Sequence, residues 1–133
     1  CLTLQPMKFE HVAFNVKEPA RVAAWYVEHL NMEIRLAMDE PPYMHFLADE
    51  SGSALFEIYN NPPDQVPDYP NQDPLILHLA FVCPDPDREK ERLLAAGCTL
   101  HQDLQTDDGR RLVMLRDPWG LPIQLCKRAQ PLL

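Results

Sequence analysis

The sequence predicts an α+β fold made of two tandem βαβββ modules, and three observations lead to that prediction. A gapless shift of 67 residues places His11 on His78 and Glu57 on Gln124 (78 − 11 = 124 − 57 = 67). Around these positions apolar and polar residues alternate, which is the pattern of half-buried strands. A proline-rich stretch separates the two similar halves. Because 133 residues make one ordinary domain, we expect the halves to share a core or a sheet.

The first module is expected at residues 7–60. Its opening strand alternates, and Pro19 follows at the first turn of a helix, where the missing N–H costs nothing. Apolar side chains then recur at helical spacing, and clusters of turn residues separate three short strands. We expect a strand at 9–16, a helix at 19–30, and strands at 33–39, 43–49 and 53–60.

The second module, at residues 75–128, repeats this order. Its helix is expected to end before Gly97, a usual residue for a left-handed helix end, and Asp108-Gly109 predicts a hairpin turn. We expect a strand at 75–83, a helix at 86–96, and strands at 98–105, 110–116 and 121–128. Residues 61–74 form a stiff proline-rich linker, residues 1–6 an N-terminal extension and 129–133 a tail, so that 7–128 is a single domain.

Composition excludes several classes of partner. The formal net charge is −8 with no cluster of Lys or Arg, which argues against nucleic acid. No apolar run is long enough to cross a bilayer, so we expect a soluble protein with no membrane partner. The four cysteines, Cys1, Cys83, Cys98 and Cys126, lack a C-x-x-C spacing. We interpret them as free, mostly buried thiols of a reducing compartment, which predicts a cytoplasmic protein.

Strand alternation places four polar residues on one face. If Phe14 and Phe81 pack under the helices, the neighbouring positions of each strand point to the opposite side of the sheet. The polar residues expected on that side are His11, Glu57, His78 and Gln124. Two imidazoles, a carboxylate and a carboxamide oxygen are a suitable ligand set for a divalent metal ion, which could polarise a substrate carbonyl or enolate.

These segments resemble a known family. HVAFNV at residues 11–16, a helix containing Trp-Tyr, and DPWGLPIQL at 117–125 are similar to motifs of the vicinal oxygen chelate superfamily. That superfamily includes glyoxalase I, methylmalonyl-CoA epimerase, extradiol dioxygenases, and fosfomycin and bleomycin resistance proteins. The resemblance covers about residues 7–128. It implies a curved eight-stranded cup of two βαβββ modules, with the metal ligands at His11, Glu57, His78 and Gln124.

The chain departs from the glyoxalase I pattern at one ligand position. Bacterial glyoxalase I has a glutamate there that also serves as catalytic base, and this chain has Gln124. An amide cannot accept a proton at neutral pH, so Gln124 can offer its oxygen to a metal but cannot act as a base. The two modules are related by a pseudo-twofold, and the resemblance therefore implies that Glu57 takes the role of catalytic base.

Three further residues are weaker candidates. His45 is expected on the same face as Glu57, as an acid or base beside the site, with an ordinary surface role as the alternative. Tyr59 could donate a hydrogen bond to substrate, or be a half-buried aromatic at a strand end. Arg116 could hold an anionic group at the rim, or pair with an acid at the following turn.

Two classes of function stay open at this point. The first is a metal-dependent enzyme on a small oxygen-rich substrate, acting by isomerisation, epimerisation, lyase chemistry or dioxygenation with Zn, Ni, Fe, Mn or Co. The second is a metal-free protein that binds a small molecule, as bleomycin resistance proteins do. Retention of both histidines and Glu57 favours the enzyme, and we expect it to be a homodimer.

Overall fold

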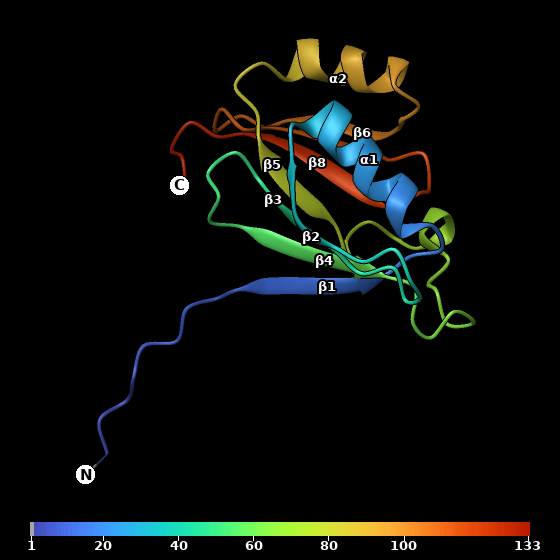
Figure 1. Ribbon diagram of the computed structural model, residues 1–133. Coiled ribbons are helices and arrows are strands. Elements are labelled where there is room, and N and C mark those ends of the chain that lie inside the picture. Colours follow the sequence, from blue (N-terminus) through green and yellow to red (C-terminus); the bar gives the residue numbers. More distant parts are fainter. Residues whose placement is uncertain (1) are drawn as a thin grey trace. The chain divides into compact units, whose positions relative to one another are not determined.

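The computed structural model describes residues 2–133 and divides into two compact units, Cys1–Pro67 and Asp68–Leu133 (Figure 1). Each unit has the order βαβββ and carries one four-stranded mixed sheet, which confirms the predicted α+β class and the duplicated module. The boundary between the two units in the sequence lies within the predicted linker. The free thiol predicted for Cys1 lies outside the described residues.

In unit 1 the single parallel pair joins the first strand to the last. The sheet order is β1-β4-β3-β2, in which β1 and β4 are parallel and the other pairs antiparallel. Helix α1 packs on this sheet, and Tyr26, Leu47 and Ile58 are fully buried between the two layers. The elements are β1 (His11–Asn15), α1 (Pro19–Leu30), β2 (Glu33–Ala37), β3 (His45–Ala48) and β4 (Leu55–Tyr59).

Unit 2 repeats this arrangement with the order β5-β8-β7-β6. Strands β5 and β8 are parallel, and α2 packs on β7 and β8 over the buried side chains of Leu93, Leu115 and Ile123. The elements are η1 (Tyr69–Asn71), β5 (Leu79–Val82), α2 (Pro86–Ala95), β6 (Thr99–Gln105), β7 (Arg111–Arg116) and β8 (Pro122–Lys127).

The 67-residue shift holds for the pairing of the first and last strands of each unit but not for the third strands. Ala13 pairs with Glu57 in unit 1, and Ala80 pairs with Gln124 in unit 2, at the same offset. Across the next ladder, however, Phe46 pairs with Glu57 whereas Met114, 68 residues further on, pairs with Gln124 (114 − 46 = 68). The third strands, β3 and β7, therefore differ by one residue in their register against the last strand of their unit. The prediction of a gapless repeat is wrong at these strands.

The linker is held by side chains at both of its ends. In unit 1 the amide of Asn15 donates to Pro62 O at 2.7 Å and accepts from Asn61 N at 2.8 Å. In unit 2 the linker forms the short helix η1, which buries Tyr69 and which the sequence pattern did not predict. Gly120 has φ +91° and lies against the ring of Pro70, so any side chain at position 120 would clash with that ring.

Cys83, Cys98 and Cys126 are buried and free, as predicted. Among residues 2–133, no helix is both long and apolar enough to span a membrane.

Candidate functional site

Strand pairing in unit 1 brings His11 and Glu57 together. Both lie on the parallel β1–β4 pair, and His11 Nε2 is 3.5 Å from Glu57 Oε1. The other ring nitrogen, Nδ1, makes a 2.7 Å contact with Glu10 Oε1, and Phe46 packs edge-on against the imidazole at 5.1 Å. The ring is thus held on two sides with Nε2 directed at the Glu57 carboxylate.

This separation fits two ligands of one metal ion. Bonds of about 2.1 Å in a tetrahedral site place neighbouring ligand atoms roughly 3.4 Å apart, close to the 3.5 Å between His11 and Glu57. The Glu10 contact also matches metal centres in which a carboxylate orients the ligating histidine. Exposures of 31% for His11 and 15% for Glu57 leave both side chains accessible to an ion.

In unit 2 a turn, rather than a strand, positions His78. The predicted strand 75–83 starts only at Leu79, because Asp73 caps a turn by accepting from Leu75 N at 2.9 Å. His78 Nδ1 lies 2.8 Å from Pro74 O. A carbonyl can only accept, so Nδ1 carries the proton and Nε2 keeps its lone pair for a ligand.

Gln124 is the unit 2 counterpart of Glu57, because it has the same position in the β5–β8 ladder as Glu57 has in the β1–β4 ladder. Its Oε1 accepts a hydrogen bond from Cys126 Sγ at 3.1 Å, and one lone pair of that oxygen stays available. Within either unit, no three His, Cys, Asp or Glu side chains of residues 2–133 cluster to hold an ion. The predicted set of His11, Glu57, His78 and Gln124 draws two residues from each unit and stays a prediction.

His45 lies on the opposite face from the one expected. It pairs with Ile58 on β4, on the helix side of the sheet, while Phe46 pairs with Glu57. His45 is buried, and its Nδ1 donates to Tyr43 O at 2.8 Å, so that the ring has a structural partner. The expected shared face with Glu57 was wrong because β3 is mostly apolar and its sequence does not indicate which side is buried. Phe46, rather than His45, is the neighbour of His11.

Arg116 binds the linker instead of an anion or an acid. Its Nη1 donates to Tyr69 O at 2.7 Å and Gly120 O at 3.2 Å, and Nη2 donates to Gln72 O at 2.8 Å. Neither use predicted from the sequence describes this arrangement. Tyr59 is half-buried at the end of β4, two residues beyond Glu57, and therefore shares its face.

The cysteine thiols are poor nucleophiles. Burial raises the pKa of Cys98 to about 12, and it also raises the pKa values of Cys83 and Cys126. All three are therefore protonated at neutral pH, and thiolate chemistry is not available to them.

Comparison with known proteins identifies the family of this chain. The model of the glyoxalase/bleomycin resistance protein/dioxygenase superfamily matches residues 8–125. Among curated proteins, none matches significantly. A glyoxalase family protein from Enterococcus faecalis is 28% identical, with coverage of 90% of this chain and 96% of that chain and a TM-score of 0.68.

Two further structures have the same fold at lower identity. TnmS3, an antibiotic binding protein from Streptomyces sp. CB03234, is 17% identical over 96% of this chain and all of that chain, with a TM-score of 0.74. A mutant of the fosfomycin resistance protein FosX from Listeria monocytogenes, complexed with Mn(II) and a dihydroxypropylphosphonic acid, is 18% identical over 96% of this chain and 94% of that chain, with a TM-score of 0.70. Because the family model spans most of the sequence, the chain belongs to the glyoxalase/bleomycin resistance protein/dioxygenase superfamily.

Proposed function

We propose that this protein is a metal-dependent enzyme that acts on a small oxygen-rich substrate by isomerisation, epimerisation, lyase or dioxygenase chemistry. Its divalent ion is held by His11, Glu57 and His78, with Gln124 as a fourth ligand. The approach of His11 Nε2 to Glu57 Oε1 carries the proposal, because 3.5 Å is the spacing of two ligands on one ion. FosX, with the same fold, was solved with Mn(II), which supports a divalent metal.

The proposed ligand residues differ in the chemistry that they can perform. When bound, the ion would stabilise negative charge on a substrate oxygen. Glu57 can accept a proton from the carbon next to that oxygen, and Gln124 cannot, so proton transfer depends on the unit 1 carboxylate. Glu10 and Pro74 O hold the two imidazoles in the tautomers that leave Nε2 free. We also propose residues 7–128 as one catalytic domain, acting as a cytoplasmic homodimer.

Metal content tests the ligand assignment. Protein purified without an affinity tag should contain a divalent ion by elemental analysis. Glu57→Gln should weaken metal binding about tenfold or more because it removes a charged ligand, whereas Gln124→Glu should tighten it. Glu50→Gln, at an exposed turn, is the matched control and should leave metal content unchanged. Equal metal content in wild type and Glu57→Gln would show that Glu57 is not a ligand.

Activity assays test which carboxylate transfers protons. We expect the wild type to show little turnover of methylglyoxal with glutathione, because Gln124 cannot serve as a base, and Gln124→Glu to gain weak activity. An acyl thioester with a racemisable centre probes epimerisation, and Glu57→Gln should abolish any such activity. Robust glyoxalase turnover by the wild type would assign the working base to another residue.

Metal-free binding of a small molecule is the second candidate, favoured by the shared fold with the antibiotic binding protein TnmS3. The same elemental analysis separates the two. Protein that takes up no divalent ion, even after incubation with Zn, Ni, Fe, Mn and Co salts, would favour the binding protein.

A further inference from the structure

Unit 2 contains an apolar cavity whose lining includes none of the proposed metal ligands. It lies where β5 and β8 end, has a volume of about 690 Å³, and is lined by Ala80, Val82, Cys126 and the C-terminal Leu132 and Leu133 among others. This volume is in the range of small-molecule sites, which are mostly apolar with a few polar groups that orient the ligand.

The charged residues of the lining, Lys127 and Arg128, are both cations. Within residues 2–133 neither side chain has a hydrogen bond or an ion pair, although the chain carries a net charge of −8. Three other arginines of the same unit are engaged, since Arg111 binds two aspartates, Arg92 binds Glu89 and Arg116 binds backbone carbonyls. The guanidinium of Arg88 on α2 resembles that of Arg128 in having no ion pair within residues 2–133. An unpaired cation beside an apolar lining favours an anionic ligand, because an ionised donor makes a strong hydrogen bond to a carboxylate.

We propose that this cavity binds a small amphipathic carboxylate, with its anionic group against Arg128 and its apolar body between Val82 and the C-terminal leucines.

The position of the cavity extends the proposed function, on which the following step rests. Along β8, alternation places Cys126 on the face of Gln124, and Arg128 follows at the next position of the same parity. Arg128 and Cys126 both line the cavity. Four residues of strand span roughly 13 Å. The carboxylate of the substrate therefore lies about that far from the oxygen that Gln124 would help to hold.

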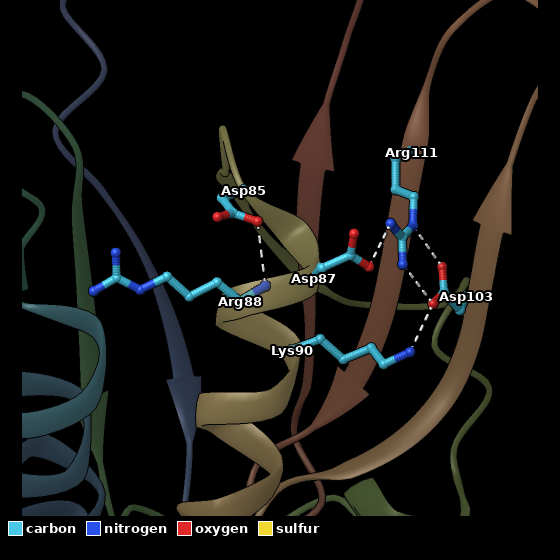
Figure 2. A network of polar contacts seen from close by, with 6 residues as sticks. All are labelled: Asp85, Asp87, Arg88, Lys90, Asp103 and Arg111. Atoms are coloured by element: carbon cyan, nitrogen blue, oxygen red, sulfur yellow. Dashed lines mark hydrogen bonds and ion pairs between the residues drawn. The ribbon is translucent and has the colours of Figure 1, made fainter.

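Calorimetric titration of chelator-treated protein tests the inference without relying on the metal. Decanoate should bind the wild type about tenfold more tightly than decanol, and decyltrimethylammonium should not bind measurably. Arg128→Gln should weaken the binding of decanoate about tenfold and leave the affinity for decanol unchanged, because only the charged contact is lost. The matched control is Arg88→Gln, which removes one charge from a side chain of α2 that points away from the ion network (Figure 2).

A second variant tests the apolar part and guards against misfolding. Ala80 is an exposed residue of β5, and Ala80→Leu fills part of the cavity. This variant should weaken the binding of both decanoate and decanol, while its circular dichroism spectrum stays native. Equal weakening of decanoate by Arg128→Gln and Arg88→Gln, or equal affinities for decanoate and decanol, would overturn the proposal. Decanoate binding by a Glu57→Gln protein that has lost its metal would support it independently; lost decanoate selectivity with intact metal content would remove this inference alone.

Discussion

Helices α1 and α2 occupy equivalent places in the two units, yet different interactions hold them to their sheets. In α1, Val22, Ala23, Trp25 and Tyr26 are all buried. At the positions 67 residues later, α2 has Glu89, Lys90, Arg92 and Leu93, of which only Leu93 is buried. Tyr26 contacts Trp25 and Phe56, so that α1 is anchored by an aromatic cluster.

An ion network supplements the single buried leucine of α2 (Figure 2). Arg111 on β7 donates to Asp103 on β6 through Nε at 2.9 Å and Nη2 at 2.8 Å, and its Nη1 contacts Asp87 of the helix at 2.8 Å. Lys90 of the helix reaches Asp103 at 2.9 Å. Hydrogen bonds from Arg111, and then Lys90, hold the pKa of Asp103 well below its usual range. The same fold position is thus stabilised by burial in one repeat and by burial plus charge in the other.

The largest expected effect is the loss of stability when the buried Tyr26 of α1 or the buried Leu93 of α2 is removed. Tyr26→Ala should lower the free energy of unfolding by about 4 kcal/mol and Leu93→Ala by about 3 kcal/mol, because both side chains are fully buried but the aromatic ring fills more volume. Midpoints of urea unfolding at constant slope measure both values. Val27→Ala, at a 38% exposed position of α1, is the control and should cost well under half as much. A larger loss for Leu93→Ala than for Tyr26→Ala would contradict the contrast between the helices.

The sequence predicted the elements well because their signals are local. Alternation around Glu57 and Gln124, the prolines that open both helices, and Asp108-Gly109 in its turn each specify backbone conformation within a few residues. The meeting of His11 and Glu57 also followed, since parity and a shared offset fix which side of each strand they occupy.

What the sequence did not predict depends on pairing and rotamers. Strand β3 (His45–Ala48) has three consecutive apolar residues after the histidine, so only its register against β4 decides that Phe46 shares the face of Glu57. The turn that shortens β5, and the contact of His78 with Pro74 O, depend on one hydrogen bond that Leu75 N donates to the Asp73 side chain. The hydrogen bonds of Arg116 to the linker form because η1, which is distant in the sequence, lies next to Arg116 in the fold.

The second prediction concerns acid. Asp103 has a folded-state pKa below its unfolded value near 3.8, so its contribution to stability is fully present above about pH 4 and is lost as the pH falls further. Asp103→Asn should cost about 1 to 2 kcal/mol at pH 7 and less in high salt, because the partly exposed pairs are screened. Urea unfolding at pH 7 and pH 3 should show a smaller loss of stability on acidification in the variant than in the wild type.

Asp108→Asn is the control for this experiment. The pKa of Asp108 is also lowered, first by Thr106 and then by Arg110, but these partners lie within the same hairpin turn and the side chain is exposed. Its replacement should leave the attachment of α2 intact. If Asp103→Asn and wild type lose the same stability between pH 7 and pH 3, the network does not hold the helix through charge.

The smallest expected effect is at the first turn of each helix. Asp85 and Glu18 are equivalent N-cap residues (85 − 18 = 67), each followed by proline, but only Asp85 caps its helix, by accepting from Arg88 N at 3.3 Å. Asp85→Ala should therefore cost about 1 kcal/mol and lower Tm by roughly 3 to 5 °C. Glu18→Ala should change the free energy of unfolding by only about 0.3 kcal/mol, since it removes a surface pair with Arg21. Asp85→Asn, which keeps an acceptor oxygen, should retain most of the stability, and a Tm as low as that of Asp85→Ala would show that charge, not capping, is what α2 requires at this position.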